Sequence, residues 1–136
     1  MTLTDTGPLV ALINRNDPNH ERCLAAAKNL PAEPLLTTWP CFTEAMYLLH
    51  RAAGYPGQLA LWSLRASTRL RLHDLSDAEA DRAAALMAKY QDRPMDLADA
   101  SLLATAETLK LNRVFSIDGD FHIYRLPDGS ALQIIP

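Results

Sequence analysis

The sequence has few cysteines and no long apolar segment, and both shortages exclude whole classes of protein. Cys23 and Cys41 are the only cysteines. They lack the spacing of a metal site, so we interpret them as reduced structural thiols. No apolar run approaches the roughly 20 residues that a transmembrane helix needs. The segment MTLTDTGPLVALIN has no basic leader and carries Asp5 ahead of its apolar run, so we expect a cytoplasmic protein.

Acidic side chains are also missing from one long stretch, residues 45–73. The whole chain has 13 Lys and Arg against 16 Asp and Glu, a net charge of −3, whereas nucleic-acid-binding proteins are usually basic. The acid-free stretch is either a solvated helix face or a basic surface for a polyanion. It contains two histidines and four arginines, namely Arg51, Arg65, Arg69 and Arg71.

The pattern of apolar residues predicts one domain, residues 1–136, in which strands alternate with helices. Hydrophobic residues make up 49% of the chain, enough for a substantial core. Strands are expected at residues 2–4, 35–38, 70–73, 114–117 and 131–135. Helices are expected to begin near Pro8 and Asp96 and to cover residues 19–29, 42–53, 58–67 and 77–90. This alternation predicts an α/β fold, a three-layer α/β/α sandwich around a mainly parallel sheet of about five strands.

Four acidic residues fall where predicted strands end or the following helices begin. Asp5 follows the first strand, and Glu44 lies in the first turn of the helix after the second strand. Asp99 lies in the first turn of the helix that opens PMDLADASLLATA, and Asp118 closes the strand at 114–117. In a parallel sheet the carboxyl ends of the strands and the N-termini of the helices share one edge. We therefore predict that these four carboxylates converge.

Convergent carboxylates favour a bound cation. They repel one another and raise each other's pKa unless a cation neutralises them. Oxygen ligands without His or Cys suit Mg²⁺ or Mn²⁺, and the helix N-termini at Glu44 and Asp99 favour the ionised acids. Setting aside the four acids and Asp96 leaves 11 acids against 13 bases. The remainder of the chain is then basic, and the net charge no longer argues against a polyanionic substrate.

Each of these acids also suits an ordinary structural role. Asp5 is placed to cap the helix at Pro8, Glu44 is favourable in a first turn, and Asp118 is a turn former. Asp99 would complete a cap that Asp96 begins. We assign different roles to Asp96 and Asp99: Asp96 starts the helix and supports the site, and Asp99 holds a metal ion.

Three further residues near these acids bear on the site. Asp120 lies two residues after Asp118, which leaves open which of the two is the fourth acid. Ser116 and Thr6 carry hydroxyls that could orient a ligand or a water, although each is more often an ordinary strand-end hydroxyl.

Four segments resemble the motifs of the PIN-domain ribonucleases, in particular the VapC-like toxins of type II toxin–antitoxin pairs. They run nearly from end to end of the chain: TDTGPLVALIN, LLTTWPCFTEAMYLL, PMDLADASLLATAE and VFSIDGDFHIYR. The fourth motif commonly begins with Thr in the family, and Ser116 keeps the hydroxyl here. No substitution removes a required carboxylate.

The resemblance implies a PIN-like fold and an Mg²⁺- or Mn²⁺-dependent endoribonuclease that hydrolyses RNA with water and leaves a 5′-phosphate. By this resemblance Asp5 and Asp99 would bind metal directly, and Glu44 and Asp118 directly or through water. It further implies a homodimer, and a cognate antitoxin through which the protein would meet DNA.

Other residues are candidates for contacts with these partners. The four arginines of residues 45–73 are candidates for the RNA backbone, which carries no sequence information. Trp39 and Tyr47 either stack bases or, as we favour, pack in the core. The apolar residues of the following helix form either a contact surface or, again as we favour, core; they are Leu59, Leu61, Trp62 and Leu64.

Three rival functions fit the sequence less well. A regulatory PIN-like protein would act mainly in an antitoxin complex on DNA, with little turnover. A receiver-like phosphoacceptor needs a lysine near the last strands, and Lys28, Lys89 and Lys110 do not end a strand. A sugar-phosphatase-type enzyme needs a DxD pair after the first strand, where this chain has DTG. The metal-dependent ribonuclease is therefore the preferred hypothesis.

Overall fold

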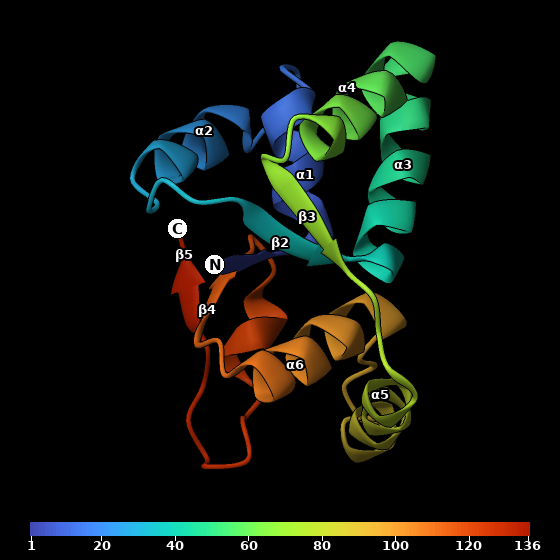
Figure 1. Ribbon diagram of the computed structural model, residues 1–136, viewed down its shortest axis with the longest axis vertical. Coiled ribbons are helices and arrows are strands. Elements are labelled where there is room, and N and C mark those ends of the chain that lie inside the picture. Colours follow the sequence, from blue (N-terminus) through green and yellow to red (C-terminus); the bar gives the residue numbers. More distant parts are fainter.

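Five short parallel strands form the centre of the fold in the computed structural model, which describes residues 1–136 (Figure 1). The sheet order is β3-β2-β1-β4-β5, and every neighbouring pair is parallel. The expected parallel sheet and α/β/α fold are therefore confirmed. The strands are β1 (Thr2–Thr4), β2 (Leu35–Thr38), β3 (Leu70–His73), β4 (Arg113–Phe115) and β5 (Gln133–Ile135).

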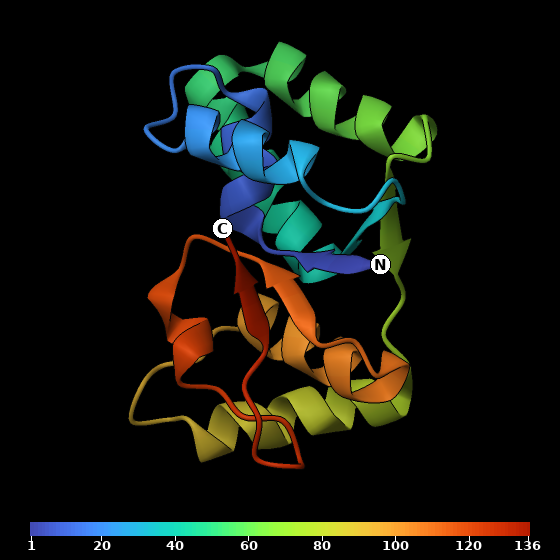
Figure 2. The same ribbon diagram turned by 90° about the vertical axis from the view of Figure 1, so that its left-hand side faces the viewer.

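Six α-helices cover the sheet. Helices α1 to α4 lie on one side and α5 and α6 on the other (Figure 2). None of them is both long enough and apolar enough to cross a membrane. The helices are α1 (Thr6–Ile13), α2 (His20–Lys28), α3 (Trp39–Ala53), α4 (Tyr55–Ala66), α5 (Asp77–Lys89) and α6 (Leu97–Leu109), with a short 3-10 helix η1 (Gly119–His122) after β4.

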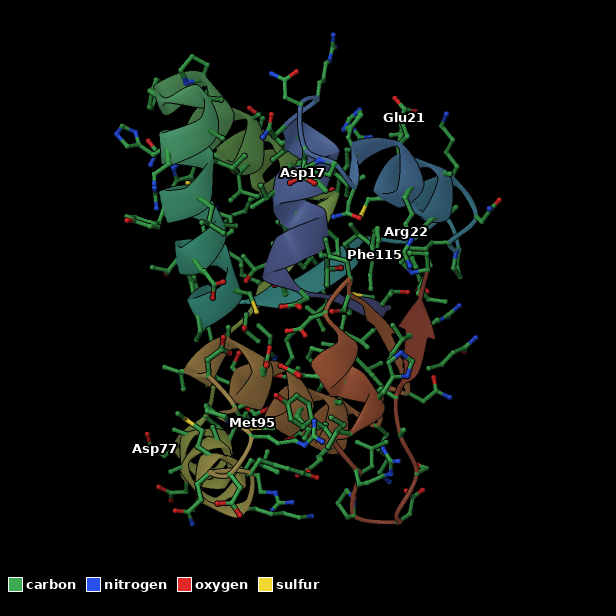
Figure 3. The ribbon with its side chains drawn as sticks, turned by 180° about the vertical axis from the view of Figure 1, so that it is seen from behind. Asp17, Glu21, Arg22, Asp77, Met95 and Phe115 are labelled. Atoms are coloured by element: carbon green, nitrogen blue, oxygen red, sulfur yellow. The ribbon has the colours of Figure 1, made fainter.

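Each helical layer builds its own core against the sheet. Helices α5 and α6 pack with Leu3 and Val114, and helices α1, α3 and α4 pack with Leu70. Phe115 at the end of β4 faces the α1–α2 layer, where it packs with Cys23 (Figure 3). Both cysteines are free and buried, as expected of structural thiols. Helix α6 is buried from Ala98 to Ala106 and thus anchors its first turn firmly in the molecule.

Helices α3 and α4 begin earlier than the sequence predicted. Helix α3 begins at Trp39 rather than Phe42, because a proline fits the first turn of a helix, where its missing N–H is not needed. Helix α4 begins at Tyr55 and contains Gly57 instead of following it. A Cβ on Gly57 would lie 3.1 Å from the Leu49 carbonyl oxygen, so glycine allows α3 and α4 to pack closely.

The strands at the C-terminal end are shorter than predicted. Strand β4 ends at Phe115 rather than residue 117, and β5 begins at Gln133 rather than residue 131. Two residues therefore separate the end of β4 from Asp118.

Several large apolar side chains expected in the core lie on the surface instead. Tyr47 is 62% exposed, Leu59 47% and Trp62 44%, so the interpretation of these residues as core is wrong. Trp39 is 38% exposed, whereas Leu61 is buried and cannot form a contact surface. Helical spacing identifies an apolar side of a helix but does not tell whether the same chain covers it.

Candidate metal centre

Three carboxylates meet at the carboxyl edge of the sheet. Oxygen atoms of Asp5, Asp99 and Asp118 all lie within 4.8 Å of one another, and we call these three residues the acidic cluster. Asp5 follows β1 and Asp118 follows β4. These two strands are neighbours, and the order in which the chain adds strands to the sheet changes direction between them. Crevices at such reversals are the usual ligand sites of open α/β sheets.

Asp5 is fixed from both sides by hydrogen bonds. It is the N-cap of α1, and its Oδ1 accepts a hydrogen bond from the backbone N–H of Thr6 at 2.8 Å. Its Oδ2 accepts one from the Ser116 hydroxyl at 2.9 Å. The side chain is 6% exposed. The capping role and a role in the cluster are therefore compatible in one carboxylate.

Asp99 is held by the start of α6 and by a tyrosine. Asp96 is the N-cap of α6, and its Oδ1 accepts a hydrogen bond from the Asp99 N–H at 2.8 Å. The Tyr124 hydroxyl donates to Asp99 Oδ2 at 2.9 Å, and Asp99 is 4% exposed. Sequence reasoning did not identify Tyr124. The only indication of Tyr124 in the sequence was its place in VFSIDGDFHIYR. The 3-10 helix η1 turns the chain back towards α6, and the spacing of residues does not predict this turn.

Ser116 connects two members of the acidic cluster. Its hydroxyl donates to Asp5 and accepts a hydrogen bond from the Asp118 N–H at 3.0 Å. The hydroxyl of Thr6 instead donates to the carbonyl of Cys41 at 3.4 Å, so it ties α1 to α3.

Asp118 and Asp120 take different places. Asp118 is the N-cap of η1, where its Oδ1 accepts a hydrogen bond from the Asp120 N–H at 3.0 Å. Because β4 ends at Phe115, Asp118 does not close the strand as predicted, yet it still joins the acidic cluster and Asp120 does not.

Glu44 lies at the rim of the site rather than within the acidic cluster. Helix α3 begins at Trp39 and has no acid in its first turn, so the predicted first-turn position is wrong. Glu44 lies one turn later and is exposed. Partial burial raises the pKa of its carboxyl, and so do the charges of Asp96 and Asp118, which places it near them.

Two members of the acidic cluster are hard to ionise, mainly because they are buried. Burial, followed by the charges of Asp5 and Asp96, raises the pKa of Asp99 to about 8. Burial also raises the pKa of Asp5 to about 6, although the Thr6 and Ser116 hydrogen bonds oppose the rise. The pKa of Tyr124 is raised by burial and by Asp99, so its hydroxyl remains a donor. A hard divalent cation suits three convergent carboxylates and would stabilise the charged forms of Asp5 and Asp99.

Comparison with known proteins places the chain in a family. Residues 2–126 match the PIN domain family. The curated protein ribonuclease VapC26 of Mycobacterium tuberculosis is 25% identical over 135 residues, which cover 98% of this chain and 99% of that protein.

Solved structures show the same fold. The crystal structure of M. tuberculosis VapC20, described as a toxin that cleaves the sarcin-ricin loop, has a TM-score of 0.83 at 23% identity and covers 90% of this chain and 94% of that one. VapBC2 of Rickettsia felis, bound to a DNA fragment from its promoter, has a TM-score of 0.65 at 15% identity and covers 99% and 98%. A toxin–antitoxin complex from Klebsiella pneumoniae has a TM-score of 0.67 at 22% identity and covers 89% and 90%. With a family match over residues 2–126 and an acidic cluster at the reversal of the sheet, the chain belongs to the PIN domain family and is similar to its VapC proteins.

Proposed function

We propose that the protein is an Mg²⁺- or Mn²⁺-dependent endoribonuclease and the toxin of a toxin–antitoxin pair, acting in the cytoplasm. The observation that carries the proposal is the convergence of Asp5, Asp99 and Asp118 within 4.8 Å in a PIN-domain chain. The similarity to ribonuclease VapC26 over nearly the whole chain supports RNA as the substrate.

The acidic cluster would hold the cation, and Glu44 would assist from the rim. When bound, such a cation acidifies a water and neutralises charge at a scissile phosphate. The protein contributes fixed ligands: Ser116 orients Asp5 and Asp118, and Tyr124 binds Oδ2 of Asp99 and leaves Oδ1 available. Asp99, whose pKa of about 8 leaves it largely protonated near neutral pH, would have to lose its proton to solvent for a cation to bind.

A cleavage assay tests this proposal. Purified protein, freed of any bound antitoxin, is incubated with a panel of single-stranded and structured RNAs in Mg²⁺, Mn²⁺ or excess EDTA. We expect fragments with 5′-phosphates in either metal and none in EDTA. Asp81→Asn, on the exposed surface of α5, serves as a control for the loss of an acid elsewhere. Full activity in EDTA would contradict the metal mechanism.

We also propose a homodimer and an antitoxin partner, which bind through the exposed apolar side chains of α3 and α4. Four of these residues define the α3–α4 face: Tyr47, Tyr55, Leu59 and Trp62. Their exposed fractions lie between 44% and 63%, and clustered exposed apolar groups mark interaction sites. Light scattering of the protein alone and with the antitoxin encoded beside it would test both interactions.

The regulatory alternative, an antitoxin-dependent DNA binder with little turnover, draws on the relative bound to promoter DNA. The acidic cluster argues against it as the main function, because DNA binding alone does not need three convergent carboxylates, two of them buried. Inactivity on the whole RNA panel, combined with tight operator binding beside the antitoxin, would favour it.

A further inference from the structure

A polar groove lies along the edge strand β3. It encloses about 400 Å³, and Leu70 and Leu72 of β3 line it. Trp39 and Asp74 lie at its end nearest the carboxyl edge of the sheet, and Arg65 and Arg71 also line it. Figure 1 shows β3 running from the end of α4 towards the start of α3. We call this hollow the Trp39 groove.

The indole of Trp39 is exposed but held in one orientation. Its Nε1 donates a hydrogen bond to Asp74 Oδ1 at 2.7 Å. Its ring also makes a T-shaped contact with Phe42, with centroids 5.4 Å apart. The strand register explains the pairing, because Thr38 lies opposite His73 and the next residues are Trp39 and Asp74. An oriented aromatic ring in contact with solvent is a platform for stacking.

The Trp39 groove carries a surplus of positive charge. Arg65 and Arg71 are both exposed, and neither forms an ion pair with a carboxylate. Asp74 is the one acid in the groove, and the Trp39 N–H already binds it. Two free guanidinium groups beside an aromatic platform therefore face solvent in a protein whose net charge is −3.

The groove begins beside the acidic cluster. Leu3 of β1 lies opposite Leu36 of β2, and the same register places Asp5 beside Thr38, one residue before Trp39. Adjacent strands lie about 4.8 Å apart. A polynucleotide that crosses the acidic cluster towards β3 therefore meets Trp39 first and the two arginines after it.

We propose that the Trp39 groove is a subsite for single-stranded RNA, in which one base stacks on Trp39 and Arg65 and Arg71 hold the neighbouring phosphates. Stacking on an aromatic ring combined with guanidinium contacts to phosphate is the usual way to bind single strands without reading their sequence. The proposal rests on the proposed ribonuclease function, because it describes how that substrate is held.

Binding without cleavage gives the first test. The probe is a fluorescently labelled oligouridine of 12 nucleotides in EDTA, followed by anisotropy. Trp39→Leu should weaken binding about 5- to 160-fold, the range for loss of one stacked base, and Trp39→Phe should retain most of the affinity. Leu109→Ala is the control, since Leu109 is 41% exposed, close to the exposure of Trp39, but does not line the groove. Unchanged affinity in Trp39→Leu would overturn the proposal.

The salt dependence of binding tests the arginines. Each phosphate contact contributes about −0.7 to the slope of log K against log salt concentration for a single strand. Arg65→Gln and Arg71→Gln should therefore each reduce the steepness of the slope by about 0.7. Arg22→Gln, on the exposed surface of α2 and outside the groove, should leave the slope unchanged. Equal slopes for all three variants would overturn the phosphate contacts.

Steady-state cleavage in Mg²⁺ separates this proposal from the nuclease function. Trp39→Leu, shown to be folded by its thermal melt, should raise KM by its loss of affinity and change kcat less than about twofold, because stacking binds substrate and transition state alike.

Wild-type cleavage with an unchanged KM in Trp39→Leu overturns the subsite and leaves the nuclease intact. Trp39-dependent RNA binding in a wild type that never cleaves supports the subsite and overturns the nuclease. Release of a co-purified antitoxin by Trp39→Leu, with RNA affinity unchanged, shows a protein-docking surface and overturns the subsite.

Discussion

The acidic cluster and the α3–α4 face are opposites in the way they hold their side chains. Asp5 and Asp99 are at least 94% buried, and buried hydroxyls and helix N-termini fix them. Tyr47 and Tyr55 are more than 60% exposed and have no such partners. Chemistry at a phosphate needs groups fixed before the substrate arrives, whereas recognition of large partners tolerates side chains that adjust on contact. The following predictions test this contrast, from the largest expected effect to the smallest.

Asp99→Asn should abolish RNA cleavage, with a loss of at least about 100-fold in kcat, because it removes one charged ligand from the acidic cluster. The matched control is Asp96→Asn, three residues earlier on the same helix. Asparagine caps helices as well as aspartate does, so this variant should stay active. Single-turnover cleavage and a thermal melt of each variant give the measurement. Equal loss in both variants, with the fold intact, would show that the division of roles between Asp96 and Asp99 is wrong.

Tyr124→Phe should weaken Mn²⁺ binding about 10- to 100-fold, the range seen when a group that orients a metal ligand is removed. The change deletes the hydroxyl that holds Asp99 and keeps the ring that packs on Phe121. Calorimetric titration with Mn²⁺ would measure it. Tyr90→Phe is the control, because its hydroxyl accepts a hydrogen bond from the Arg125 N–H and does not contact the cluster. Unchanged Mn²⁺ affinity in Tyr124→Phe would show that the ring alone positions Asp99.

The stability of the metal-free protein should fall as pH rises from about 5 to 8. The pKa of Asp99 is raised to about 8 in the folded protein, whereas an unfolded aspartate loses its proton near pH 4. Between these values the folded state binds more protons than the unfolded state, so raising the pH favours unfolding. Thermal melts at several pH values in EDTA, repeated with Mn²⁺, give the test. Asp99→Asn should flatten the pH dependence, and a wild-type stability that rises over this range would contradict the assignment.

Leu59→Ser on the α3–α4 face should change the free energy of unfolding by no more than about 0.5 kcal/mol, as is usual for exposed positions. Leu61→Ala, two residues away on the same helix, should cost about 2–5 kcal/mol because Leu61 is fully buried. Urea titrations of both variants would measure the difference. Loss of self-association in Leu59→Ser, with stability preserved, would show that the α3–α4 face serves binding rather than folding.

Much of this fold was readable from the sequence because its signals are local. Helix α5 begins at Asp77 as predicted, behind a capping box formed by Ser76 and Glu79, and β2 and β3 occupy their predicted residues. The position of Asp99 in the first turn of α6 also followed from the chain itself.

What sequence reasoning missed depends on contacts between distant segments. The hydrogen bond from Tyr124 to Asp99 requires η1 to turn the chain back, and the spacing of apolar residues does not predict that turn. The exposure of Trp39 and Trp62 was missed for a related reason. An apolar stripe on a helix has the same spacing whether this chain or a partner covers it.

The hydrogen bond between Ser116 and Asp5 joins residues 111 positions apart. The ribosome thus makes Asp5 long before Asp99 and Asp118, the other two members of the cluster. A chain still emerging from the ribosome has Asp5 and Asp99 but lacks Asp118, and β1 lacks its β4 neighbour. A protein that hydrolyses RNA would then lack a complete metal site until Asp118 has been made.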